Sequence, residues 1–116
     1  MPLLTLKTNI ALSQDQQHTL LPRLSRAVAE LLGKAERYVM VSLDTEAPMS
    51  FAGTTEPAAY LELKSIGLPQ EQTRTYSQAL CDLVEQHLHI PRDRVYIEFS
   101  DAPRPMWGWN GTTFER

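Results

Sequence analysis

Cysteine is nearly absent from this sequence of 116 residues. The single residue, Cys81, has no partner for an intramolecular disulfide, so the fold cannot depend on one. Cys81 lies within a helical pattern of apolar residues, where a small buried side chain is the expected role. A nucleophilic thiol is the alternative interpretation of this position.

An excess of positive charge is also absent. The chain has 11 lysine and arginine residues against 14 aspartate and glutamate residues, and its 3 histidines are scattered. It therefore lacks the basic stripe that nucleic acid or an anionic membrane surface requires, and we expect neither partner. Long uncharged apolar runs are lacking too, and the start at Met1 has no basic flank of the kind found in signal peptides. We expect a cytoplasmic protein, or one released without a signal peptide.

The length of the chain fits one domain, and we expect residues 1–116 to form it. A domain of this size leaves about a third of its unfolded surface exposed after folding. A partner subunit would therefore add to its stability.

Alternation of apolar and polar residues predicts four strands. The segments with this period of two lie near residues 4–7, 38–43, 59–64 and 95–99. The pair Asn110-Gly111 is typical of a tight hairpin, which predicts a short β-ribbon at the C-terminus.

Helical spacing of apolar residues predicts two helices. The first lies between the capping residue Ser13 and Gly33, which suits a left-handed C-cap. Pro22 interrupts its pattern, and we expect a kink there because a proline inside a helix loses a hydrogen bond. Pro69 suits the first turn of the second helix, which continues to Leu88.

The order strand, helix, strand occurs twice, and residues 35–39 leave the first helix much as residues 92–96 leave the second. We expect an α/β fold in which two pseudo-repeated β-α-β units form a four-stranded sheet, plus the C-terminal ribbon. Right-handed crossovers put both helices on one face of such a sheet. The other face would carry Tyr60 and Tyr96 and is too apolar for a free surface, which predicts contact with other subunits.

Pro2 is the strongest candidate for a catalytic group. Removal of Met1 would turn it into an N-terminal secondary amine at the start of an apolar strand. An α-amino group titrates near pH 7.7–8.0, so burial or a nearby cation needs to lower its pKa only slightly to leave a free base at neutrality. Such an amine can act as a general base. The alternative interpretation is that Met-Pro is simply an ordinary chain start.

Motifs along the whole chain resemble the macrophage migration inhibitory factor branch of the tautomerase superfamily. The matching segments, in chain order, are Pro2, Thr8-Asn9, Gly33-Lys34, Thr54-Thr55-Glu56-Pro57, Ser65-Ile66-Gly67, Arg74-Thr75-Tyr76-Ser77, Arg94-Val95-Tyr96-Ile97 and Gly108-Trp109-Asn110. The resemblance implies a homotrimer whose sheets enclose a central channel, with active sites at the subunit boundaries.

The resemblance also implies the chemistry. In such enzymes the N-terminal proline, here Pro2, moves a proton within the keto-enol pair of an aromatic α-keto acid such as phenylpyruvate, without a cofactor. Lys34 would lower the pKa of the amine and hold the substrate carboxylate, while the backbone at Ser65-Ile66 would contact substrate. The matching pocket aromatics are Tyr38, Tyr96, Trp109 and Phe114, with Tyr96 reaching in from a neighbouring subunit. A solvated lysine and ordinary packing aromatics are the alternative interpretations.

Two residues depart from the family pattern. Glu98 stands where mammalian members have an asparagine, on the same strand face as Tyr96. A carboxylate there would favour the protonated amine and repel an anionic substrate, which predicts weaker phenylpyruvate turnover unless a cation such as Lys34 pairs with it. Trp107 replaces a small aliphatic residue and should narrow the mouth of the pocket.

Other activities are less well supported. No Cys-x-x-Cys pair is present, so we expect no thiol-disulfide activity, and His87 with His89 has no cysteine cluster nearby that would predict a metal site. The main alternative to a tautomerase is a signalling protein that binds a receptor, with incidental catalysis. Hydration or dehalogenation of unsaturated acids is a third hypothesis, but the additional arginines near the proline that those branches use have no match here.

Overall fold

The computed structural model describes residues 1–115 and contains one mixed sheet of four strands and a separate two-stranded ribbon. The order in the large sheet is β2-β1-β3-β4. Its strands are β1 (Leu3–Thr8), β2 (Met40–Asp44), β3 (Ala59–Ile66) and β4 (Val95–Ala102). The ribbon consists of β5 (Gly108–Trp109) and β6 (Thr112–Thr113), joined by the predicted Asn110-Gly111 turn.

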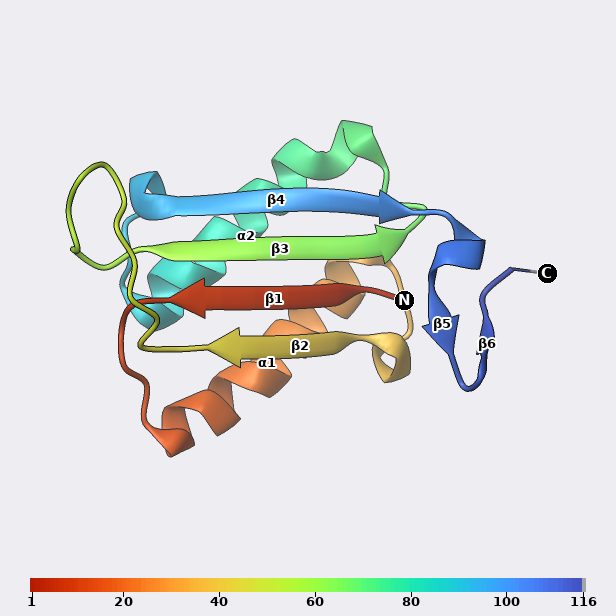
Figure 1. Ribbon diagram of the computed structural model, residues 1–116, viewed down its shortest axis with the longest axis horizontal. Coiled ribbons are helices and arrows are strands. Elements are labelled where there is room, and N and C mark those ends of the chain that lie inside the picture. Colours follow the sequence, from red (N-terminus) through yellow and green to blue (C-terminus); the bar gives the residue numbers. More distant parts are fainter. Residues whose placement is uncertain (116) are drawn as a thin grey trace.

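The predicted pseudo-repeat is confirmed by the pairing of the strands. β1 pairs with β2 in parallel and β3 pairs with β4 in parallel, while β1 and β3 meet as antiparallel neighbours in the middle. Each parallel pair is joined through one helix, α1 (Gln14–Leu32) or α2 (Thr73–Leu88). Both helices lie behind the sheet in Figure 1 and leave the face toward the viewer uncovered.

The core lies between the helices and one face of the sheet. The alternating leucines of β1 and β3 point into it, and the stripes of both helices cover them. Its members with almost no exposed surface are Leu4, Leu6, Leu24, Val28, Leu61, Leu63, Leu80, Val84 and Ile90. Cys81 is also buried, and this burial raises the pKa of its thiol, as expected for a packing residue rather than a nucleophile.

The ends of α1 follow the local signals in the sequence. Ser13 and Gln16 form the complete capping box, and Gly33 ends the helix in the left-handed conformation. The helix runs continuously through Pro22, which is exposed, and the kink expected there stays a prediction.

Two expected boundaries were wrong. Pro69 does not lie in the first turn of α2, because a 3-10 turn over Gln70–Gln72 comes between them and α2 begins at Thr73. Tyr38 belongs to the 3-10 turn Glu36–Tyr38 rather than to a strand, and β2 begins at Met40. A matching 3-10 turn, Arg92–Arg94, precedes β4. These short turns reverse the chain between helix and strand in both halves.

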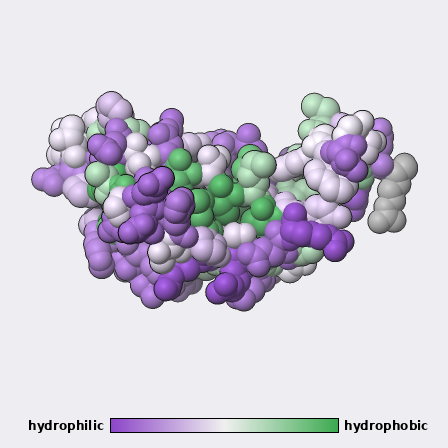
Figure 2. All heavy atoms as spheres, turned by 90° about the horizontal axis from the view of Figure 1, so that it is seen from below, coloured by the Kyte–Doolittle hydropathy of each residue, from purple (hydrophilic) through white to green (hydrophobic). Residues whose placement is uncertain are grey.

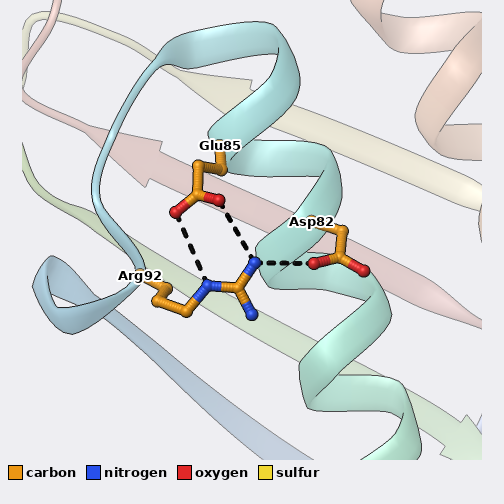
Figure 3. A network of polar contacts seen from close by, with 3 residues as sticks. All are labelled: Asp82, Glu85 and Arg92. Atoms are coloured by element: carbon orange, nitrogen blue, oxygen red, sulfur yellow. Dashed lines mark hydrogen bonds and ion pairs between the residues drawn. The ribbon is translucent and has the colours of Figure 1, made fainter.

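Side-chain contacts of Arg92 connect the turn Arg92–Arg94 to α2. Its Nη2 donates to Asp82 Oδ1 at 2.6 Å and to Glu85 Oε1 at 3.2 Å, as Figure 3 shows. All three side chains are exposed, so the network fixes the position of the turn more than it adds to stability.

Candidate functional site

The candidate site lies at the end of the sheet where β1 begins. Pro2 precedes β1 and its side chain is fully buried, while its carbonyl accepts a hydrogen bond of 3.0 Å from the backbone N–H of Met40. The N-terminus, the turn before β2 and the β5-β6 ribbon all meet at this end in Figure 1. Segments from the start, middle and end of the chain therefore surround Pro2.

A groove of about 500 Å³ opens beside Pro2. Its lining combines apolar and aromatic side chains with two cations. The lining residues are Met1, Pro2, Leu3, Arg37, Tyr38, Val39, Met40, Lys64, Met106, Trp107, Gly108, Trp109 and Phe114. This composition is typical of a small-molecule site that takes an organic anion.

Three aromatic rings form one wall of the groove. Tyr38 meets Trp109 edge to face, with ring centroids 5.4 Å apart, and meets Phe114 in the same manner at 6.1 Å. Trp109 and Phe114 are stacked, with centroids 5.7 Å apart and an interplanar angle of 15°. The backbone N–H of Phe114 donates to Trp107 O at 3.2 Å, which holds the chain end against the ribbon. Such a wall suits an aromatic ligand.

The electrostatics at the chain start favour a free amine. Burial, and then the positive charge of Lys34, lower the pKa of the N-terminal amine below its ordinary value. In this structure that amine belongs to Met1, and the nitrogen of Pro2 is part of a peptide bond. Lys34 itself is half-buried and does not line the groove, so it acts on the chain start through its charge.

The structure brings five of the predicted site residues together. Those that line the groove are Pro2, Tyr38, Trp107, Trp109 and Phe114. Ser65 and Ile66 end β3 as buried residues, directly after Lys64, and their side chains do not line the groove. The turn that follows them is held by Asp101, whose Oδ1 accepts from the N–H groups of Gly67 at 2.9 Å and Leu68 at 3.0 Å.

Tyr96 and Glu98 lie apart from the groove of their own chain. Both project from β4 on the uncovered face, where Tyr96 contacts Phe51 with ring centroids 4.8 Å apart. Glu98 does not pair with Lys34, the cation considered from the sequence; it accepts a hydrogen bond from the hydroxyl of Tyr60. That hydrogen bond, with smaller effects of desolvation and neighbouring carboxylates, raises the pKa of Tyr60 to about 12.

Sequence reasoning missed both cations that line the groove. Lys64 pairs in register with Leu3, which places it one residue from Pro2 along the neighbouring strand. Arg37 precedes Tyr38 and lies over its ring, with 5.0 Å from the guanidinium carbon to the ring centroid. The alternation in β3 assigned Lys64 to the uncovered face, but only the pairing of β1 with β3 places it beside Pro2.

A metal-binding cluster and a membrane-spanning helix are both absent from the described residues. Across residues 1–115, no three histidine, cysteine or acidic side chains lie close enough to hold a metal ion, and this includes His87 and His89. In the same range, neither helix combines the length and apolar composition that crossing a bilayer requires.

Comparisons with known proteins agree on one family. The family model described as macrophage migration inhibitory factor matches residues 1–115. A macrophage migration inhibitory factor homologue of Trichinella spiralis is 40% identical over 115 residues, covering 98% of this chain and 100% of the relative. The Xenopus laevis protein of that name is 36% identical and covers 98% and 99% of the two chains.

Solved structures give the same result for the fold. The crystal structure of a macrophage migration inhibitory factor homologue from Prochlorococcus marinus superimposes with a TM-score of 0.92 and 47% identity, covering 97% of this chain and 99% of the other. The Trichinella spiralis structure superimposes with a TM-score of 0.91 and 39% identity, with the same coverage.

Proposed function

Because this chain belongs to the macrophage migration inhibitory factor family, we propose that it is a keto-enol tautomerase of aromatic α-keto acids such as phenylpyruvate, with Pro2 as general base. The observation that carries the proposal is the groove itself. It combines a buried Pro2, an aromatic wall and cations at the end of one sheet.

Pro2 becomes a base only when Met1 has been removed. Its nitrogen then ends the chain and carries a lone pair that no peptide bond delocalises. Burial and the charge of Lys34, which lower the pKa of the amine of Met1, act in the same direction on an amine one residue farther along the chain. Both effects lower the pKa of a secondary amine in these surroundings and so favour its free base, the form that can accept a proton.

The reaction requires no cofactor. Pro2 takes a proton from the carbon next to the keto group, the electrons of that C–H bond form the enolate, and water protonates the enolate oxygen from the opposite side. The protonated Pro2 then returns its proton to water, which restores the base. The aromatic wall of Tyr38, Trp109 and Phe114 holds the ring of the substrate. Lys34, acting through its charge, stabilises the substrate carboxylate, and the backbone at Ser65-Ile66 contacts the substrate.

We propose a homotrimer as the active form. On the uncovered sheet face the large side chains of Tyr96, Met40 and Tyr60 are 66%, 64% and 37% exposed, and such a group of exposed apolar side chains is typical of a contact surface. Figure 2 shows a further hydrophobic area in the middle of the side formed by β2 and α1. Contact between three copies would cover these surfaces and bring Tyr96 of one chain to the groove of the next.

The test is a phenylpyruvate tautomerase assay on protein whose N-terminal residue has been identified by mass spectrometry. Protein that starts at Pro2 should be active, and an alanine inserted between Met1 and Pro2 should lower kcat by roughly 10² to 10⁴, the usual contribution of a general base. Pro2→Gly should lower kcat while leaving the fold intact by circular dichroism. Equal activity of the inserted and the processed proteins would refute the role of Pro2.

A receptor-binding signalling role is the second candidate, and the names of the relatives favour it. The Pro2→Gly protein separates the two functions. A biological effect that survives in this variant would be independent of catalysis, whereas an effect lost together with turnover would belong to the enzyme.

A further inference from the structure

Two cations lie on opposite sides of β1, the strand that follows Pro2. In the strand order β2-β1-β3, Met40, Leu3 and Lys64 stand in one row across the sheet. Lys64 is thus on the β3 side of Pro2, and Arg37 is in the turn just before β2 on the other side. The strands β2 and β3 on either side of β1 lie two strand spacings apart, about 10 Å.

The charge of the groove is one-sided. Among the described residues that line it, Arg37 and Lys64 are cations and none carries a carboxylate. Lys64 has one loose partner, with 3.7 Å between its Nζ and Glu62 Oε2, and its side chain is 43% exposed. Arg37 has no carboxylate within ion-pair distance among residues 1–115. Both cations are therefore available to bind an anion.

The aromatic wall lies at the Arg37 end. The guanidinium of Arg37 stands over Tyr38, which in turn contacts Trp109 edge to face. A substrate that presents its keto acid to Pro2 and Lys64 and packs its ring on this wall would direct the far end of the ring toward Arg37. A guanidinium is a geometrically specific partner for a carboxylate at that position.

We infer that the preferred substrates are aromatic α-keto acids with a second anionic group on the ring, bound by Lys64 at the keto acid and by Arg37 at the ring. The inference rests on the tautomerase function proposed above and adds the class of substrate. Lys64 and Arg37 are specificity residues, and Pro2 remains the base.

The experiment compares 4-carboxyphenylpyruvate with phenylpyruvate, using protein that starts at Pro2. We expect kcat/KM of the dianion to exceed that of phenylpyruvate roughly tenfold, the effect of one added charge-assisted contact. Arg37→Gln should remove this preference by lowering kcat/KM of the dianion more than that of phenylpyruvate, and Arg37→Lys should retain part of it. The preference should shrink as salt is added, because Arg37 is exposed. Lys64→Met should lower kcat/KM for both substrates, and Arg26→Gln, an exposed arginine of α1, is the matched control.

A binding measurement separates this inference from the proposed function. Tryptophan fluorescence can follow the binding of 4-carboxycinnamate and cinnamate, which do not tautomerise, because Trp107 and Trp109 line the groove. Tighter binding of the dianion, lost in Arg37→Gln, would support the inference even if neither keto acid were turned over, and that lack of turnover would count against the tautomerase alone. Equal kcat/KM and equal affinity of the wild type for monoanion and dianion, or an equal loss for both in Arg37→Gln, would overturn the inference while leaving the proposed tautomerase function in place.

Discussion

Thr8 is a buried polar residue that joins the end of β1 to the start of β3. Its side chain is 0% exposed, and its Oγ1 donates to the carbonyl of Ala58, also 0% exposed, at 2.8 Å. The same oxygen accepts from the N–H of Ile10 at 3.3 Å. Thr8→Val keeps the shape of the side chain but removes both hydrogen bonds, so it isolates their contribution.

The expected cost follows from the burial of these groups. A buried carbonyl that loses its donor costs about 1–3 kcal/mol, and the weaker bond from Ile10 adds a few tenths, so Thr8→Val should lower the free energy of unfolding by about 2 kcal/mol. Thr5→Val is the matched control, since Thr5 Oγ1 lies 3.5 Å from Glu62 O on the uncovered face and its loss should cost less than about 0.5 kcal/mol.

Urea denaturation at one fixed protein concentration measures both variants, because the stability of an oligomer depends on concentration. Thr8 is at the opposite end of β1 from Pro2, so the kinetic constants of the folded Thr8→Val protein should not change. Equal stabilities of the two variants would refute the argument from burial.

Three further predictions concern the site. Lys34→Met removes a charge that lowers the pKa of the chain-start amine, so that pKa should rise. Because only the free base is active, kcat/KM of the protein that starts at Pro2 should begin to decrease at a higher pH when the pH is lowered. Lys34→Arg should keep the original pH profile. Asp101→Ala removes the acceptor that holds the N–H of Gly67, and we expect KM for phenylpyruvate to rise several-fold with kcat little changed, as steady-state kinetics would show. Glu98→Asn removes a negative charge and should raise kcat/KM for phenylpyruvate; an unchanged rate and KM would contradict the inhibitory role of this carboxylate.

Much of the fold was predictable because its signals are local. The capping box of Ser13 and the left-handed Gly33 bound α1 as expected, since each depends on residues within one turn of the helix. The hairpin at Asn110-Gly111 formed for the same reason. The start of α2 was misplaced because a proline suits the beginning of a 3-10 turn as well as that of an α-helix.

The candidate site was predictable only in part. Pro2 and the aromatic wall were identified through motifs that the family shares. Lys64 and Arg37 belong to no such motif, and their place in the groove depends on which strands are neighbours. Glu98 was placed on the correct face, but its partner, Tyr60, comes from a strand that the sequence alone did not align with it.

Periodicity and short motifs were enough to predict the main helices and strands, the pseudo-repeat, the faces on which side chains lie and the likeness to one family. Which residues surround Pro2 followed only from the way the strands pair and the chain end folds back. The antiparallel meeting of β1 and β3 brings Lys64 beside the chain start, and the return of the C-terminal ribbon adds Trp107, Trp109 and Phe114. Contacts of this kind join residues far apart in the chain, and strand pairing, rather than local propensity, sets them.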